Sequence, residues 1–282
     1  MRWYNRVPPH FYFVASAIFH YLGPSFAVLL FAKVSVDGVA WLRIASAGLV
    51  FLLWRKPWAA FKKSTPRARY LILALGVTFA LMNYSFYYAI SILPLGTVAG
   101  IEFLGPVLLV MIGTKTLRNL AALALTVTGV WLLTDVRIEG EPEGFIWAFA
   151  NAFCFVVYII IAHLIADIDT STRPVDLLGA AMLIATIVIT PLGFYGALPA
   201  FTDSWLLLAG IGVGLSSSVI PYVLDQLAMA KLSRATYSLF VALLPATAVT
   251  IGVLVLKQIP KMIEIMAVVS IVCGVLISKD KA

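Results

Sequence analysis

The chain has 282 residues, 62% of them hydrophobic and 12% charged, with a mean hydropathy of +1.01 and a net charge of +7. A water-soluble domain does not need this much apolar surface, so the composition indicates a protein whose solvent is mainly lipid. The length is enough for about ten membrane helices of roughly 20 residues with short connections, which leaves little for an extramembrane domain.

Ten apolar stretches predict an all-α polytopic membrane protein with ten transmembrane helices. Turn and charge signals separate them, among them Asp37-Gly38, the basic segment 55–69 and the acidic run 135–143. The first stretch has no small-residue cleavage site after it, so we expect it to be retained rather than removed as a signal peptide. The predicted spans are 10–32, 38–54, 70–91, 96–115, 117–134, 144–166, 175–195, 204–229, 234–256 and 261–278.

The distribution of lysine and arginine predicts that both termini are cytoplasmic. With the N-terminus inside, fifteen of these residues fall in cytoplasmic segments, and four fall in outer loops, namely Lys33, Arg137, Lys257 and Lys261. Short cytoplasmic loops of membrane proteins carry such an excess of positive charge. The same asymmetry accounts for the net charge without any nucleic acid, because anionic lipid headgroups lie on that side.

Two segments of the chain, 88–113 and 227–252, are similar without gaps at an offset of 139 residues. This offset carries five spans, and an odd number of spans places the second copy in the membrane in the opposite orientation. We therefore expect two inverted five-helix repeats, residues 1–139 and 140–282, which predict alternating access around a site near the midplane. The identical pairs are Ala89/Ala228, Leu93/Leu232, Thr97/Thr236, Leu104/Leu243, Pro106/Pro245, Val110/Val249, Ile112/Ile251 and Gly113/Gly252.

Three segments carry a resemblance to a known family: 100–106 (GIEFLGP), 216–226 (SSSVIPYVLDQ) and 243–247 (LLPAT). The chain resembles the ten-helix EamA-type family of the drug/metabolite transporter superfamily over its whole length, and it is most similar to the threonine/homoserine exporter group. The resemblance implies an exporter of the bacterial inner membrane. It also implies a central cavity lined mainly by the first, third, fourth, sixth, eighth and ninth helices.

An acidic residue, Glu102, lies inside the fourth predicted span. A charge there is costly unless it is paired, hydrated or functional. Burial favours the neutral form of a carboxylate, so Glu102 can exchange a proton or present a negative charge to the ammonium group of a substrate. Two other interpretations stay open: a static ion pair with Arg43 of the second span, and exposure to a water-filled vestibule.

Pro106 and Pro245 occupy matching positions of the two repeats. Pro106 lacks the N–H group that would bond to the carbonyl of Glu102 in a regular helix. Matched interruptions predict hinges, or free carbonyls that face the site, whereas a tolerated membrane kink is the alternative.

The third predicted span carries Asn83, Tyr84, Tyr87 and Tyr88, whose spacing of three and four residues places amide and phenol groups on one face. Such a face suits a cavity that holds an ammonium group by aromatic rings and a carboxylate by hydroxyls, and an interhelical packing seam is the alternative. The candidate substrate-binding residues are His20, Tyr21, Asn83, Tyr84, Tyr87, Glu102, Asn151, Tyr158, Ser217, Tyr222 and Tyr237.

The sequence has no phosphate-binding glycine loop, no metal-ligand spacing and no nucleophile elbow, so we expect no enzyme, no cofactor and no metal. A channel is a weaker alternative, because it would not require matched prolines. We predict a secondary exporter of a small polar metabolite such as threonine or homoserine, with Glu102 as the proton-coupling candidate. The main rival is a broad exporter of cationic drugs and hydrophobic metabolites, and a homodimer is left open.

Overall fold

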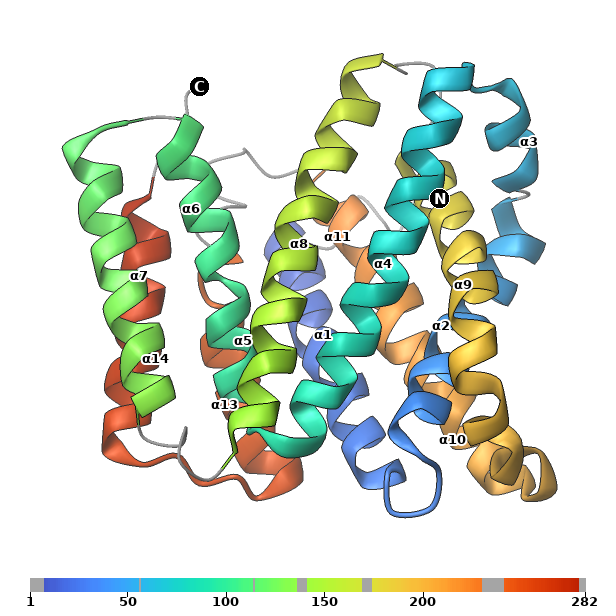
Figure 1. Ribbon diagram of the computed structural model, residues 1–282. Coiled ribbons are helices and arrows are strands. Elements are labelled where there is room, and N and C mark those ends of the chain that lie inside the picture. The colour runs from blue at the N-terminus through green and yellow to red at the C-terminus, as the bar shows by residue number, and fades with distance from the viewer. Residues whose placement is uncertain are drawn as a thin grey trace.

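The computed structural model is all-helical, and it describes residues 8–55, 57–113, 115–135, 141–168, 174–229 and 241–278. Seven of the described helical segments are long and apolar enough to cross a membrane, and three further apolar helices are shorter. Their order along the chain agrees with the ten predicted stretches, so the protein is a polytopic membrane protein (Figure 1).

The first half of the chain contains four of the long apolar segments, one of the shorter apolar helices and one short connecting helix. Prolines begin α1 and α4, where a missing N–H group costs nothing, and Thr65 caps α4 by accepting a hydrogen bond from the backbone N–H of Ala68 at 3.2 Å. The helices are α1 (Pro9–Leu30), α2 (Val36–Arg55), α3 (Pro57–Lys63), α4 (Pro66–Ile92), α5 (Leu95–Glu102), α6 (Leu104–Gly113) and α7 (Leu117–Asp135).

The described part of the second half contains three of the long apolar segments and two of the shorter apolar helices. Proline again begins the first two long helices, and Asp203 caps the third by accepting hydrogen bonds from the backbone N–H groups of Trp205 and Leu206. The elements are α8 (Pro142–Ile168), α9 (Pro174–Thr202), α10 (Ser204–Gly214), the π-helical turn η1 (Leu215–Val219), α11 (Ile220–Met229), α13 (Leu244–Leu256) and α14 (Met262–Ile277).

Helices from the two halves pack in a pattern that is similar when the halves are exchanged. α4 lies along α8, and α1 lies along α10, η1 and α11. α1 also packs on α13, and in the corresponding contact α8 packs on α5 and α6. The two remaining pairs are α2 with α9 and α7 with α14. Figure 1 shows α7 and α14 side by side at one end of the molecule, with α5 and α13 between them and the other helices.

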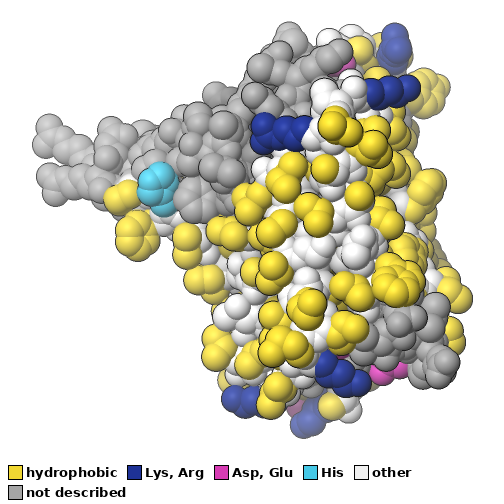
Figure 2. Space-filling model, turned by 90° about the vertical axis from the view of Figure 1, so that its left-hand side faces the viewer, with side chains coloured by type: hydrophobic (Ala, Val, Ile, Leu, Met, Phe, Trp, Pro, Cys, Tyr) yellow, Lys and Arg dark blue, Asp and Glu magenta, His cyan; other side chains and the backbone are white. Residues whose placement is uncertain are grey.

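The outer surface is apolar in the middle and basic at its ends. Leu53, Phe153 and Ile187 are among many large apolar side chains that remain exposed. Figure 2 shows one such face, where hydrophobic side chains cover the central band and Lys and Arg side chains gather above and below it. This distribution is what a bilayer requires of a membrane-spanning surface.

Candidate functional site

A buried arginine marks the polar interior of the molecule. Arg43 of α2 is 5% exposed, and its Nε donates a hydrogen bond to the hydroxyl of Ser218 at 3.1 Å. Its Nη2 reaches the carbonyl oxygen of Ser217 at 3.4 Å, and its guanidinium lies 5.2 Å from the centre of the Tyr87 ring. Arg43 is thereby held between η1 and α4 by a hydrogen bond and a cation–π contact.

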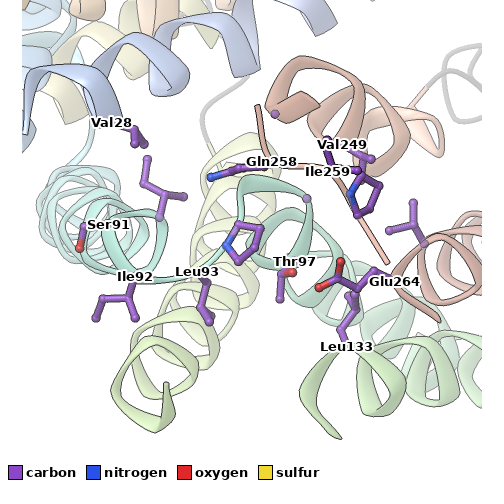
Figure 3. A pocket seen from close by; sticks show the side chains of 16 residues that line it. Val28, Ser91, Ile92, Leu93, Thr97, Leu133, Val249, Gln258, Ile259 and Glu264 are labelled. Atoms are coloured by element: carbon purple, nitrogen blue, oxygen red, sulfur yellow. The ribbon is translucent and has the colours of Figure 1, made fainter. Parts of the chain in front are cut away.

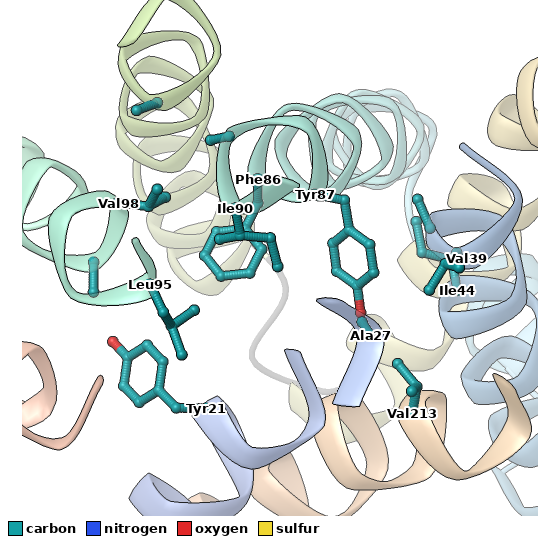
Figure 4. Packing of buried hydrophobic residues seen from close by; sticks show 14 of the residues in the cluster. Tyr21, Ala27, Val39, Ile44, Phe86, Tyr87, Ile90, Leu95, Val98 and Val213 are labelled. Atoms are coloured by element: carbon teal, nitrogen blue, oxygen red, sulfur yellow. The ribbon is translucent and has the colours of Figure 1, made fainter. Parts of the chain in front are cut away.

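Three fully buried polar side chains around this centre make no hydrogen bond of regular geometry, although Tyr87 lies close to Ser217 and Arg43, and Asn151 lies close to Glu102. They are the hydroxyl of Tyr87 on α4, the amide of Asn151 on α8 and the hydroxyl of Ser217 on η1, each at 0% exposure. In Figure 4, Tyr87 extends from α4 toward α1 with its hydroxyl at the far end. Unpaired buried polar groups are costly, so several of them together indicate a place that a polar molecule occupies.

Glu102 ends α5 and faces the same interior. The side chain of Asn151 lies beside its carboxyl group, and Arg43 and Tyr21 lie within electrostatic range of it. Arg43 and Glu102 form no ion pair among the described side chains, so the static pair considered from the sequence is absent. The site therefore holds a cation and an acid that do not neutralise each other by direct contact.

Most of the other predicted site residues lie around this centre. His20 packs edge-on against Tyr21 with ring centres 5.3 Å apart, and it lies within electrostatic range of Arg43. Tyr158 and Tyr222 both contact the ring of Phe79, and Phe155 stacks on Tyr158. The aromatic walls of the site thus come from α1, α4, α8 and α11.

Tyr84 and Asn83 of α4 have different surroundings. Tyr84 forms an aromatic cluster with Tyr88 and with Trp147 of α8, whose rings lie 4.8 Å and 5.9 Å away, so it is apart from the Arg43 centre. The amide of Asn83 is buried and donates to the carbonyl oxygen of Phe79 at 2.8 Å in its own helix. Tyr237 lies outside the described residues.

Glycine allows the helices to approach closely at this centre. A Cβ atom on Gly23 of α1 would overlap the hydroxyl and the backbone nitrogen of Ser217, and one on Gly214 would lie 2.6 Å from the carbonyl oxygen of Arg43. The backbones of α1, α2 and η1 therefore meet where Arg43 is held.

The two predicted hinge prolines lie next to helix interruptions. Phe103, three residues before Pro106, separates α5 from α6. Residues 242–243, just before Pro245, likewise form a turn at the start of α13. The interruption places Glu102 at a helix end, where its backbone carbonyl is not closed by a regular hydrogen bond from Pro106.

A separate pocket of about 290 Å³ opens at one end of the molecule, between the α4–α5 turn and the α13–α14 loop. Figure 3 shows Gln258, Thr97 and Glu264 around this opening. The side-chain oxygen of Gln258 accepts a hydrogen bond from the backbone N–H of Leu95 at 3.1 Å, so this contact joins the two halves across the pocket.

Arg43 is the residue that sequence reasoning undervalued. From the sequence it was considered only as a partner for Glu102, whereas the structure places it against Ser218 and Tyr87. The available signal was the same as for Glu102, because Arg43 is a lone charge within an apolar span. Among the described residues, no cluster of three His, Cys, Asp or Glu side chains could hold a metal ion.

A polytopic helical protein with buried polar side chains between its membrane helices has features that are common in membrane transporters. Residues 142–279 match the EamA-like transporter family. The family is one of transporters, and the match covers the second part of the chain.

Most of the chain is distantly related to known exporters. It is 28% identical over 256 residues to the threonine/homoserine exporter RhtA of Salmonella typhimurium (strain LT2), covering 89% of this chain and 84% of the relative. It is 27% identical over 255 residues to the threonine/homoserine exporter RhtA of Escherichia coli (strain K12), with the same coverage. A solved crystal structure shares the fold, with a TM-score of 0.59, 16% identity and coverage of 95% of this chain and 96% of that one.

Proposed function

We propose that the protein is a secondary active exporter of small polar metabolites, and that its substrates are amino acids similar to threonine and homoserine. The observation that carries this proposal is the group of unpaired, fully buried polar side chains, Tyr87, Asn151 and Ser217, between helices of both halves. These groups offer hydrogen-bonding atoms to a small polar ligand between the helices. The distant relationship to threonine/homoserine exporters supports the choice of amino acids.

Alternating access is the transport mechanism that the fold supports. The helix contacts are similar when residues 1–139 and 140–282 are exchanged, as expected for two inverted five-helix repeats. The proposed hinges are Pro106 and Pro245, each of which lies within three residues after a helix interruption. Rocking of one repeat against the other would expose the Arg43 and Glu102 region to each face in turn.

The proposed location is the bacterial inner membrane, with both termini in the cytoplasm. The basic residues Lys62, Lys63 and Arg67 then lie on the cytoplasmic side, around α3 and the start of α4. The pocket at Gln258 then lies on the outer side, where an exported substrate would leave.

Uphill export requires an energy source, and we propose proton entry with Glu102 as the carrier. A carboxyl group that reaches a substrate site between helices can bind a proton from one side and release it to the other as access alternates. Asn151, beside Glu102, offers an amide that can hydrogen-bond either form of the carboxyl group.

A broad exporter of organic cations is the second candidate. One acid, Glu102, and the aromatic rings of Tyr87, Tyr158 and Tyr222 would suffice to hold such a cation. This alternative gives no role to the buried guanidinium of Arg43, which would repel a cationic drug.

A thermal-stability screen of the purified protein in detergent tests the proposal. A ligand that binds the folded state raises the unfolding temperature, and the panel is amino acids, quaternary ammonium compounds and sugar phosphates. We expect a rise with threonine and homoserine, followed by saturable flux of the same compounds in proteoliposomes. A rise only with quaternary ammonium compounds would favour the second candidate, and flux that does not saturate would indicate a channel.

A further inference from the structure

We propose that Arg43, together with the hydroxyls of Tyr87 and Ser217, forms a subsite for the carboxylate group of the substrate, so that the site selects zwitterions rather than cations. The inference rests on the proposed export function and adds the chemical feature by which a substrate is recognised. It assigns to α2 a role in binding that is separate from the role of Glu102 on α5.

The geometry of Arg43 leaves part of its guanidinium available. Its hydrogen bonds to described residues use Nε, toward the hydroxyl of Ser218, and Nη2, toward the carbonyl of Ser217. Neither of these hydrogen bonds uses Nη1. A guanidinium has five N–H donors in a planar fork, and this fork matches the two oxygens of a carboxylate.

The charge of Arg43 also lacks a neutralising partner. By contrast, Arg55 at the end of the same helix forms an ion pair with Asp176, with Nε and Oδ1 2.7 Å apart, although both side chains are more exposed than that of Arg43. Arg43 is 5% exposed, and among the described residues it meets only hydroxyl, carbonyl and aromatic groups. An unpaired buried cation is strongly unfavourable, so an anionic group of a ligand is the expected counter-charge.

Two unpaired hydroxyls stand next to this cation. Tyr87 holds the guanidinium against its ring at 5.2 Å from the ring centre, and its own hydroxyl is buried close to Ser217 and Arg43 without a hydrogen bond of regular geometry. The hydroxyl of Ser217 is also buried without a partner, on the turn that binds Arg43 through its carbonyl. Both can donate to a carboxylate oxygen, which gives an anion more donors than Arg43 alone.

The acid of the site is placed on another helix. Glu102 on α5 lies beside Asn151 of α8, and it makes no ion pair with Arg43. A ligand with an ammonium group and a carboxylate would neutralise both charges at once. A ligand with only a positive charge would leave Arg43 unneutralised.

The test compares two ligands that differ only in the carboxylate. L-Threonine is measured against L-threoninol, in which a CH₂OH group replaces the carboxylate, by equilibrium binding to the purified full-length protein. We expect the wild type to bind threonine about tenfold to a hundredfold more tightly, the range for hydrogen bonds to charged groups. Arg43→Gln should lose this preference through weaker threonine binding, while threoninol binding stays the same or improves.

Two further variants keep the test valid if Arg43→Gln does not fold. Tyr87→Phe retains the ring under the guanidinium and removes only the hydroxyl, so it should weaken threonine binding several-fold and leave threoninol binding unchanged. Arg67→Gln, at an exposed position of α4, removes a charge outside the site and should preserve the ligand preference.

The outcomes separate the two proposals. If Arg43→Gln or Tyr87→Phe keeps the full wild-type preference for threonine, or loses both ligands equally, the carboxylate subsite is wrong while the export function stands. If the wild type binds neither compound and responds only to quaternary ammonium ions, the proposed function itself fails and the subsite fails with it.

Discussion

At the scale of single residues, the site combines one cation, one acid and several unpaired polar groups. Arg43 is fixed by Ser218 and Tyr87, whereas Glu102 lies at a helix end beside Asn151. A cation in a fixed position suits substrate binding, whereas an acid at a helix end suits a group that gains and loses a proton during the transport cycle. The proposed roles of Glu102 and of the buried hydroxyl of Ser217 can be tested separately.

Glu102→Gln retains size and hydrogen bonding but cannot exchange a proton. We expect it to abolish threonine export driven by a pH gradient in proteoliposomes and to spare threonine/threonine exchange, which needs no net proton movement. Glu102→Asp, which retains the acid, serves as the control and should keep part of the gradient-driven flux. If Glu102→Gln also abolishes binding and exchange, Glu102 is a substrate ligand rather than a proton carrier.

Ser217→Ala tests whether the hydroxyl of Ser217 lowers the stability of the folded protein and at the same time contributes to substrate binding. The buried hydroxyl of Ser217 has no partner, so its removal should raise the free energy of unfolding by about 1 kcal/mol while weakening threonine binding. The matched control is Ser25→Ala, because Ser25 is equally buried but donates to the carbonyl of Tyr21 at 2.9 Å. Ser25→Ala should bring no gain in stability, and an equal gain in both variants would contradict the argument.

At the scale of helices, interruptions rather than straight segments surround the site. α5 and α6 are separated at Phe103, residues 242–243 turn before α13, and the π-helical turn η1 divides α10 from α11. π-Turns are frequent at functional sites because they alter the helix face that side chains present. Here the turn contains Ser217 and Ser218, whose carbonyl and hydroxyl oxygens accept hydrogen bonds from Arg43.

Pro106→Ala and Pro245→Ala test the proposed hinges. Alanine restores an N–H group to each helix, so the helices should straighten and resist bending. We expect each variant to slow threonine flux several-fold with little change in threonine affinity, and the double variant to be slower still. Pro191→Ala is the control, because Pro191 lies inside α9 at an exposed position and should leave flux unchanged. Equal slowing by Pro191→Ala would show that any membrane proline has this effect.

At the scale of the whole molecule, the basic residues and the pocket at Gln258 define two different faces. α3 carries the exposed Lys62 and Lys63, whereas Lys257 lies in the α13–α14 loop beside the pocket. If the positive-inside rule sets the orientation, α3 faces the cytoplasm and the pocket faces outward.

Cysteine labelling checks this orientation. Lys62→Cys and Lys257→Cys are made separately in a chain with Cys154→Ala and Cys273→Ala, and intact cells are treated with a membrane-impermeant maleimide. We expect Lys257→Cys to be labelled and Lys62→Cys to react only after the cells are opened. The reverse labelling pattern would show that the topology is opposite to the one proposed, and it would contradict the proposed direction of transport.

The sequence by itself determined the class of fold and the number and order of its apolar segments. Lipid requires each span to satisfy its own backbone hydrogen bonds over about 20 apolar residues, so spans can be recognised one at a time. The breaks near Pro106 and Pro245 follow from equally local chemistry, and the same kind of reasoning identifies Glu102 as a lone acid within an apolar span.

Only the tertiary structure decided which polar side chains meet. Arg43 contacts Ser218 and Tyr87 instead of pairing with Glu102, and Tyr84 joins Trp147 instead of the central site. These partners are separated by tens to hundreds of positions in the chain, and their contact depends on how each helix is rotated and how closely glycines such as Gly23 let it approach. Helical periodicity specifies which residues share a face, but interhelical packing specifies what that face meets.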